Sequence, residues 1–161
     1  MRTLSLLVGG ILIGMGIQMA IGQSQNSGIV GINHVGLAVE DMDAAIGYYT
    51  ETLGYPEAFR IENEAGEIGL VYVQVSRNTF VELQPTNENR GPGLNHFGVV
   101  VDDMDAAIEM WRGRGIEVQD ARSSSTNAIL SNIFDPNGVR MELLELPPES
   151  EHAQAVARWG Q

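Results

Sequence analysis

The sequence contains neither cysteine nor lysine, and all nine of its basic residues are arginine. The absence of cysteine excludes disulfides, thiolate catalysis and cysteine-ligated metals, and the absence of lysine excludes Schiff-base chemistry through a lysine side chain. The 21 acidic residues bring the formal net charge to -12. We therefore expect neither nucleic acid nor an anionic membrane surface as a partner, because both attract clustered positive charge.

Residues 1–22 differ from the rest of the chain. They include no acidic residue and are apolar from about Leu4 to Ala20. Small residues at Ala20 and Gly22 are typical of a signal cleavage site, so we expect export to the periplasm or to the outside of the cell, with a flexible linker over 23–30. An uncleaved membrane anchor is the alternative, because the apolar run approaches the roughly 20 residues that span a bilayer.

One phrase occurs twice in the remaining chain. Residues 31–46 read GINHVGLAVEDMDAAI, and residues 93–108 read GLNHFGVVVDDMDAAI. A second echo pairs Phe80-Val81-Glu82-Leu83 with Arg140-Met141-Glu142-Leu143. Self-similarity at a nearly fixed offset indicates a duplicated structural unit. We therefore predict a single domain over 31–146 that consists of two modules.

Both modules are predicted to have the order β-α-β-β-β. Alternating apolar residues indicate the strands, an aspartate before each helix is a typical N-cap, and a glycine ends each helix. In module 1 (31–85) the expected strands are 32–39, 57–63, 68–75 and 79–84, and the helix is 42–53. In module 2 (93–146) the expected strands are 96–101, 116–121, 128–134 and 139–146, and the helix is 104–114. The expected fold is α+β, with one cupped, mostly antiparallel sheet, helices on its outer face and an acidic tail over 147–161.

Side-chain alternation along the strands places four residues of metal-binding type on one face. They are His34, Glu82, His96 and Glu142. Their neighbours Val35, Val81 and Leu83 point the other way, because successive residues of a strand face opposite sides. Two imidazoles and two carboxylates suit one divalent ion such as Zn, Ni, Co, Mn or Fe(II), and the sequence does not choose among them. A pair of modules that binds a ligand without metal is the alternative.

On these motifs the chain resembles the vicinal oxygen chelate superfamily, which includes glyoxalase I, methylmalonyl-CoA epimerase, extradiol dioxygenases and fosfomycin-resistance enzymes. The resemblance covers about residues 30–146. It lies in Asn-His-x-Gly on a first strand followed by an Asp-capped helix, and in Phe134-Asp-Pro-Asn-Gly-Val-Arg-Met-Glu-Leu-Leu near the end of module 2. The resemblance implies that the first and last strands of each module supply the metal ligands, which by position are His34, Glu82, His96 and Glu142.

The resemblance also implies a reaction type. Four ligands of this kind are similar to those of the glyoxalase and epimerase branches, in which a carboxylate beside the metal moves a proton next to a carbonyl. Glu142 would then be ligand and base, and Glu82 could share that work. A secreted binding module without catalysis and an extradiol-type dioxygenase remain as alternatives, although a fourth protein ligand counts against the dioxygenase. Arg140 could clamp a substrate carboxylate or phosphate, or pair with a neighbouring acid, and Arg60 and Asn63 could also touch substrate.

The expected partners are a small oxygenated substrate and a second copy of the chain. The predicted export counts against glutathione adducts and coenzyme A thioesters as substrates, because both are mainly cytoplasmic. The linker Pro85–Pro92 spans at most roughly 26–29 Å. It leaves open whether the modules pair within one chain or are exchanged between the chains of a homodimer. His152, in the tail, is expected to be exposed on a short terminal helix.

Overall fold

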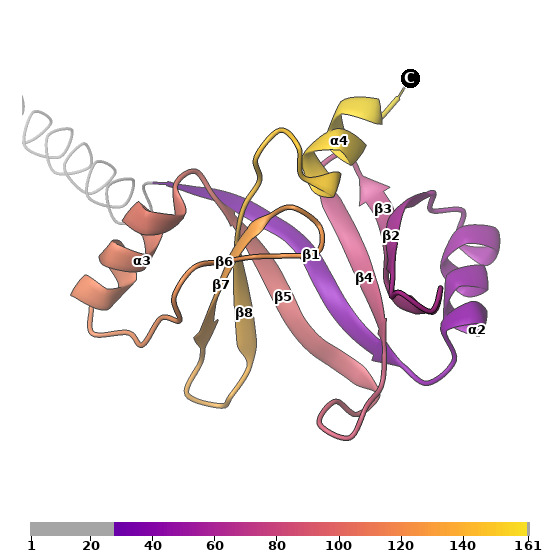
Figure 1. Cartoon of the computed structure of the whole chain (residues 1–161), viewed down its shortest axis with the longest axis horizontal. Helices are drawn as coiled ribbons and strands as arrows, with labels where there is room; N and C mark the ends of the chain where they lie inside the picture. The colour runs from indigo at the N-terminus through magenta and orange to yellow at the C-terminus, as the bar shows by residue number, and fades with distance from the viewer. Residues whose placement is uncertain (1–27, 161) are drawn as a thin grey trace, which may run out of the picture.

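The computed structural model describes residues 28–160, so the export signal predicted for residues 1–22 lies outside the described residues. The described chain folds into one curled sheet of eight strands flanked by helices (Figure 1). The strands are β1 (Ile29–Val39), β2 (Glu57–Glu62), β3 (Ile68–Ser76), β4 (Thr79–Pro85), β5 (Gly93–Val101), β6 (Arg122–Ser123), β7 (Ile129–Phe134) and β8 (Arg140–Glu145). The helices are α2 (Met42–Gly47), the π-helix η1 (Tyr48–Thr52), α3 (Met104–Gly113) and α4 (Glu151–Arg158).

The order of the strands across the sheet is β2-β3-β4-β1-β5-β8-β7-β6. In each module the first strand lies parallel to the last strand, so β1 pairs with β4 and β5 pairs with β8. The other pairs are antiparallel, including the β1–β5 pair that joins the modules. The predicted α+β fold with a curled, mostly antiparallel sheet is confirmed, and both modules of one chain share this sheet.

The helix of each module begins at the aspartate that the sequence indicates. Asp41 Oδ1 accepts a hydrogen bond from the backbone N–H of Ala44 at 2.9 Å. Asp103 Oδ1 accepts from the N–H of Ala106 at 2.9 Å. Each carboxylate therefore satisfies one of the amides that a helix start leaves without an intrahelical partner.

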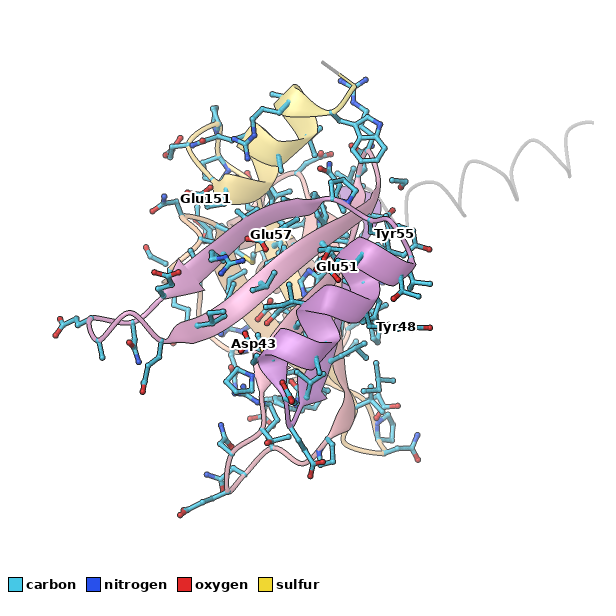
Figure 2. All side chains as sticks on the ribbon, turned by 90° about the vertical axis from the view of Figure 1, so that its right-hand side faces the viewer. Asp43, Tyr48, Glu51, Tyr55, Glu57 and Glu151 are labelled. Atoms are coloured by element: carbon cyan, nitrogen blue, oxygen red, sulfur yellow. The ribbon has the colours of Figure 1, made fainter. Side chains whose placement is uncertain are left out.

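The first helix changes its form before it ends, which the sequence did not indicate. After α2 the chain continues as η1, and the N–H of Leu53 donates to the carbonyl of Tyr48 at 3.0 Å, the spacing of a π-helix. Gly54 then adopts a positive φ of 74° and ends the helix as predicted. Figure 2 looks onto this stretch, with Asp43 and Glu51 on its exposed surface.

Apolar side chains on the convex face of the sheet pack against α2 and α3, which lie at its two sides in Figure 1. The cluster at α3 includes Val99, Val101, Leu143, Met104 and Trp111. The cluster at α2 includes Val71, Val73, Leu83, Leu37 and Tyr49. Val35 lies on the same face of β1 but is 36% exposed. The side chains expected to point away from the two repeated histidines thus build the core under the helices.

The strand predicted over 116–121 is wrong. In its place the structure has a single bridge between Val118 and Ile133 and the two-residue strand β6. The carbonyl of Val118 accepts a hydrogen bond from the Arg112 guanidinium at 2.8 Å, and the carbonyl of Gln119 accepts one from the Ser131 hydroxyl at 2.6 Å. Because side chains take these two acceptors, the segment follows the edge of β7 without a regular ladder.

The C-terminal segment is a helix that packs against the sheet. Ser150 caps α4 by accepting from the N–H of Ala153 at 3.2 Å, and Ala155 is buried against Phe59, Tyr72 and Phe80. The terminal helix that the sequence indicated is present, but the prediction that His152 is exposed is wrong, because this side chain is fully buried. No helix within residues 28–160 is long and apolar enough to cross a membrane.

Candidate metal centre

The register of the four central strands brings the repeated histidines and glutamates to one place on the concave face. Across β4, β1, β5 and β8, one row consists of Glu82, Gly36, His96 and Arg140. The next row consists of Phe80, His34, Gly98 and Glu142. In each row a glycine of one module lies beside a histidine of the other. We call the concave region around His34, Glu82, His96 and Glu142 the cup.

The two glycines leave the space that the histidine rings occupy. A Cβ added at Gly36 would lie 2.1 Å from Cε1 of His96, and one added at Gly98 would lie 2.2 Å from Cε1 of His34. Atoms of a side chain cannot approach so closely. The glycine in each Asn-His-x-Gly motif is therefore needed by the histidine of the opposite module, which explains why the repeat contains both residues.

The distances among the four side chains fit one metal ion. Nε2 of His34 and Nε2 of His96 are 2.9 Å apart. Distances from these nitrogens to Glu82 Oε2 are 3.4 and 3.1 Å, and those to Glu142 Oε2 are 3.6 and 3.8 Å. Ligands that each lie about 2.0–2.2 Å from one ion are separated by roughly 3–3.6 Å, and all four candidate ligand atoms lie within 4.8 Å of one another.

An asparagine orients each histidine. Asn33 Oδ1 is 3.0 Å from Nδ1 of His34, and Asn95 Oδ1 is 3.0 Å from Nδ1 of His96. Neighbours on a strand normally face opposite sides, but the β1–β5 pairing skips Asn33 on β1 and Asn95 on β5, so each asparagine occupies a β-bulge. An amide oxygen only accepts, so at His34 this contact places the proton on Nδ1 and leaves the Nε2 lone pair directed at the centre.

This donor set needs a cation. Two Nε2 atoms and two carboxylates converge in a buried space, where like partial charges repel strongly. The pKa of His34 is lowered from 6.5 to about 3, chiefly by burial; Glu82 opposes this shift, and the charges of His96, His152 and Arg140 add to it. A proton is therefore held poorly at this imidazole near neutral pH. The residues fit a divalent ion with mixed nitrogen and oxygen ligands.

The two glutamates have different surroundings. Glu82 accepts a hydrogen bond from the buried hydroxyl of Tyr72 at 2.7 Å. Burial by itself raises the pKa of Glu82, but the hydrogen bond from His96, the charges of both imidazoles and the Tyr72 hydroxyl together lower it. For Glu142, burial and the charge of Glu82 raise the pKa above its usual value despite His96 and two arginines. Glu82 is thus held as a fixed carboxylate, whereas Glu142 can hold a proton more readily.

Arg140 is engaged inside the cup. Its guanidinium donates to Glu142 Oε1 at 3.3 Å and to Asn95 Oδ1 at 2.9 Å, and it also lies 2.7 Å from Nδ1 of His96. In this structure Arg140 forms the ion pair that was one of its two expected roles. Arg122, which the sequence did not single out, lies 3.9 Å from the same carboxylate. The two arginines place positive charge beside Glu142 in an otherwise acidic protein.

The structure does not bring Arg60 or Asn63 into the cup. Arg60 donates to Glu57 on the same strand, and both side chains are partly exposed. Asn63 shapes the turn between β2 and β3, where its Oδ1 accepts from the N–H groups of Ala65 and Glu67 at 2.9 Å. Both side chains therefore make local contacts outside the cup.

A cavity of about 180 Å³ opens beside three of the four ligand-type residues. Its lining includes Glu82, His96, Glu142, Arg140, Tyr72 and His152. Sequence reasoning missed Tyr72 and His152 because neither belongs to the repeated phrase. Tyr72 could have been found from the hairpin that β3 forms with β4, because the register of this pair places Tyr72 directly opposite Glu82. Nothing in the sequence pattern indicates that α4 folds back over the cup.

Comparison with known proteins identifies the superfamily and its lyase and isomerase relatives. A sequence model described as "Glyoxalase/Bleomycin resistance protein/Dioxygenase superfamily" matches residues 33–133. A probable chloroplastic lactoylglutathione lyase of Arabidopsis thaliana is 29% identical in an alignment of 133 positions that covers 73% of this chain and 36% of that relative, so the chain spans about a third of its length. A probable lactoylglutathione lyase of Vibrio parahaemolyticus is 27% identical over 125 residues, covering 71% of this chain and 89% of the relative.

Solved structures show the same fold. The crystal structure of methylmalonyl-CoA epimerase from Mycobacterium tuberculosis superposes with a TM-score of 0.65 and 28% identity, and the match covers 76% of this chain and 92% of that chain. A second methylmalonyl-CoA epimerase structure, with selenomethionine, has a TM-score of 0.61 and 27% identity over 74% of this chain and 97% of its own. The similarity extends over nearly the whole length of both epimerases.

Proposed function

Because this chain belongs to the glyoxalase/bleomycin resistance protein/dioxygenase superfamily, we propose that it is a metal-dependent lyase or isomerase. The reaction would move a proton at a carbon next to a carbonyl group of a small oxygenated substrate. The observation that carries the proposal is the convergence of two Nε2 atoms and two carboxylates in the cup. Relatives named as lactoylglutathione lyase and methylmalonyl-CoA epimerase support this reaction class.

The four side chains of the cup have separate tasks in the proposed reaction. A bound divalent ion supplies a Lewis acid that stabilises negative charge on substrate oxygen. His34, His96 and Glu82 would hold the ion, since the asparagines and Tyr72 keep these three groups in place. Glu142 would be the fourth ligand and the base that takes the proton from carbon.

The surroundings of Glu142 support this division of roles. Its burial favours the protonated form, which a group that accepts and returns a proton must reach. The neighbouring Arg140 can stabilise the carboxylate when the proton has left, or turn to a substrate carboxylate. Glu82 lacks this freedom because the Tyr72 hydroxyl is bonded to it at 2.7 Å. The fourth protein ligand also counts against an extradiol dioxygenase, which keeps metal positions open for substrate and oxygen.

The proposal also includes export and self-association. The apolar segment 1–22 supports export to the periplasm or beyond, and fractionation of cells that express the full chain tests it. Exposed Val30, Ile32 and Leu94 support a homodimer, because large apolar side chains in contact with water favour association. All four candidate ligands come from one chain, so the proposed metal site needs no residue from a second copy. Light scattering of the purified protein measures the oligomeric state.

Metal analysis and proton exchange test the catalytic proposal. The purified chain should contain or take up one equivalent of divalent metal. The metal-loaded protein is then incubated in D2O with 2-oxoaldehyde hemithioacetals and 2-substituted acyl thioesters, and NMR monitors exchange at the carbon next to the carbonyl. Glu142→Gln should keep its fold and lose roughly 10²–10⁴-fold in exchange rate, whereas Glu64→Gln at an exposed position should behave as wild type.

Two outcomes would contradict the proposal. Full exchange activity in Glu142→Gln would refute the assignment of the base. A purified chain that takes up no stoichiometric divalent metal but still binds a small ligand tightly would instead favour the binding module without catalysis.

A further inference from the structure

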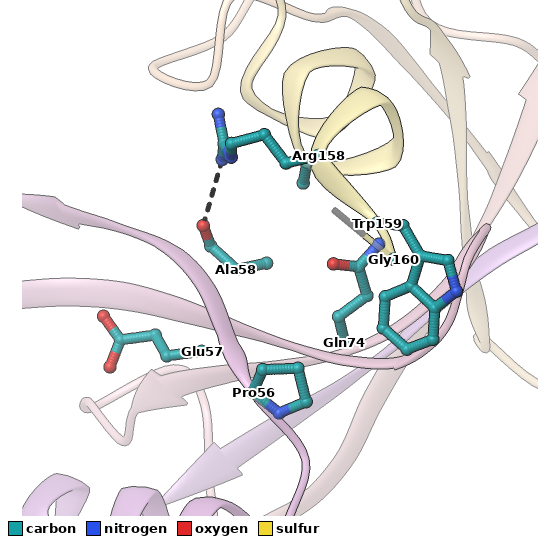
Figure 3. Close-up of a pocket in the computed structure, with 8 residues that line it drawn as sticks. Pro56, Glu57, Ala58, Gln74, Arg158, Trp159 and Gly160 are labelled. Carbon is teal, nitrogen blue, oxygen red and sulfur yellow. Dashed lines mark hydrogen bonds between the residues drawn. The ribbon is translucent and has the colours of Figure 1, made fainter.

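The C-terminal helix α4 closes one side of the cup. At its start the N–H of Glu151 donates to the carbonyl of Thr126 at 2.9 Å, which ties the helix to the loop before β7. At its end Arg158 donates to the carbonyl of Ala58 on β2 at 3.3 Å, and Figure 3 shows this bond beside Trp159 and Gln74. The helix is therefore held at one end against the loop before β7 and at the other against β2, above the sheet in Figure 1.

This helix brings a third histidine to the cup. His152 is fully buried and lines the same cavity as Glu82, His96 and Glu142. Its ring lies 6.2 Å from that of His34, centroid to centroid, with 26° between the planes. Neither of its ring nitrogens has a hydrogen-bond partner among residues 28–160.

Three aromatic side chains pack around the ring of His152. Tyr72, Phe59 and Phe80 present edges or faces to the imidazole with centroids at 4.5, 4.9 and 5.5 Å. Burial lowers the pKa of His152 from 6.5 to about 4, and the charge of Glu82 opposes this shift. A neutral imidazole has one N–H donor and one nitrogen acceptor. Leaving both buried without a partner costs free energy that a phenyl ring of similar shape would avoid.

The structure assigns His152 as a substrate-binding residue of the cup, in which a ring nitrogen hydrogen-bonds an oxygen of the substrate that the metal does not hold. This inference rests on the proposed function, because it places the substrate beside the metal ligands. Two adjacent oxygens would face the metal, and at least one further oxygen would face α4. With Arg140 and Arg122 beside Glu142, the substrate class is a small oxygenated acid, such as a 2-oxo or 2-hydroxy carboxylate.

Oxalate is a suitable probe, because it chelates a metal through two oxygens and presents two more. Isothermal titration measures oxalate binding to the metal-loaded full chain and, separately, metal binding. His152→Phe should bind metal with wild-type affinity and have an equal or higher melting temperature, since a phenyl ring suits the aromatic enclosure. Its oxalate affinity should be about tenfold weaker or more. His152→Gln should recover part of that affinity, because the glutamine amide supplies a hydrogen-bond donor and acceptor in place of those of the imidazole.

Gln154→Ala is the matched control, because Gln154 lies on the exposed side of the same helix. It should leave oxalate binding unchanged. Equal oxalate affinity in wild type, His152→Phe and His152→Gln would overturn the inference and leave the proposed function standing. Loss of metal binding in both His152 variants would also overturn it, because the residue would then act on the metal site. Failure of metal-loaded wild type to bind oxalate would overturn the inferred substrate class of small oxygenated acids, whereas the proton-exchange assay tests the proposed function separately.

Discussion

Replacement of Gly98 by alanine adds one methyl group at the most crowded point of the cup. The new Cβ would lie 2.2 Å from Cε1, 2.4 Å from Nδ1 and 2.8 Å from Nε2 of His34. Ordinary contact begins near 3.4 Å, so the ring or the backbone must move by about 1.2 Å. The ring has little room to move, because His34 is fully buried and packed edge-on against Tyr72 and His96.

This displacement is large on the scale of a metal site. Ligands must keep their positions within about 0.5 Å to hold an ion well, and the shift would also break the 3.0 Å contact between His34 and Asn33. We expect divalent metal affinity to fall by roughly 100-fold or more. Overpacking should also lower the free energy of unfolding by about 1–3 kcal/mol, equivalent to a melting temperature lower by about 3–12 °C.

Gly47→Ala is the control for the Gly98→Ala variant. Gly47 has helical φ and ψ at the junction of α2 and η1, and a Cβ there meets no atom within 4 Å. The Gly47→Ala variant should therefore bind metal with wild-type affinity and be slightly more stable than wild type. Isothermal titration with the metal and differential scanning calorimetry of the apoprotein measure both effects. If Gly98→Ala retained wild-type metal affinity, the argument that the glycine makes room for the ligand ring would be refuted.

Two further predictions concern His34 and the acid sensitivity of the fold. Asn33→Ala removes the acceptor at Nδ1 of His34, so metal affinity should fall about 10-fold while Asn33→Asp largely restores it; equal affinity in all three proteins would show that the contact does not orient the ring. The apoprotein should also lose stability as pH falls from 6.5 towards 4, because the unfolded chain protonates His34 and His152 before the folded chain does. Each histidine contributes about 1.4 kcal/mol of this loss by pH 5.5, and Glu142 offsets part of it because its pKa is raised in the folded chain. Urea titrations at several pH values measure the free energy of unfolding. Equal acid sensitivity in wild type and His152→Phe would contradict the reasoning.

Much of the fold could be predicted because the sequence repeats its signals. The duplicated phrase locates two equivalent strands and two equivalent helices, and Asp41 and Asp103 cap those helices as expected. Alternation along the strands is a local property, so it also placed the repeated histidines and glutamates on one face. The strand predicted over 116–121 is wrong although the segment has a strand-like pattern, and side chains hydrogen-bond to its carbonyls instead.

The parts of the site that could not be predicted depend on contacts between distant segments. Asn33 and Asn95 reach their histidines only because the β1–β5 pairing skips them, and register is a property of the paired strands. Tyr72 distinguishes Glu82 from Glu142 across a different strand pair. The sequence indicates His152 only as a polar residue of an acidic tail. In the structure apolar side chains of α4 pack against the sheet, and this packing buries His152.

The sequence by itself determined the duplicated architecture, the donor types of the candidate site and the face they share. These follow from chain periodicity and from the chemistry of imidazole and carboxylate groups, both of which are written in local order. Only the tertiary structure decided that one chain brings the four donors together, that each glycine makes room for the histidine of the opposite module, and that α4 adds a buried imidazole to the cup. The reason is physical: register, close packing and burial arise between segments that meet only when the sheet has formed.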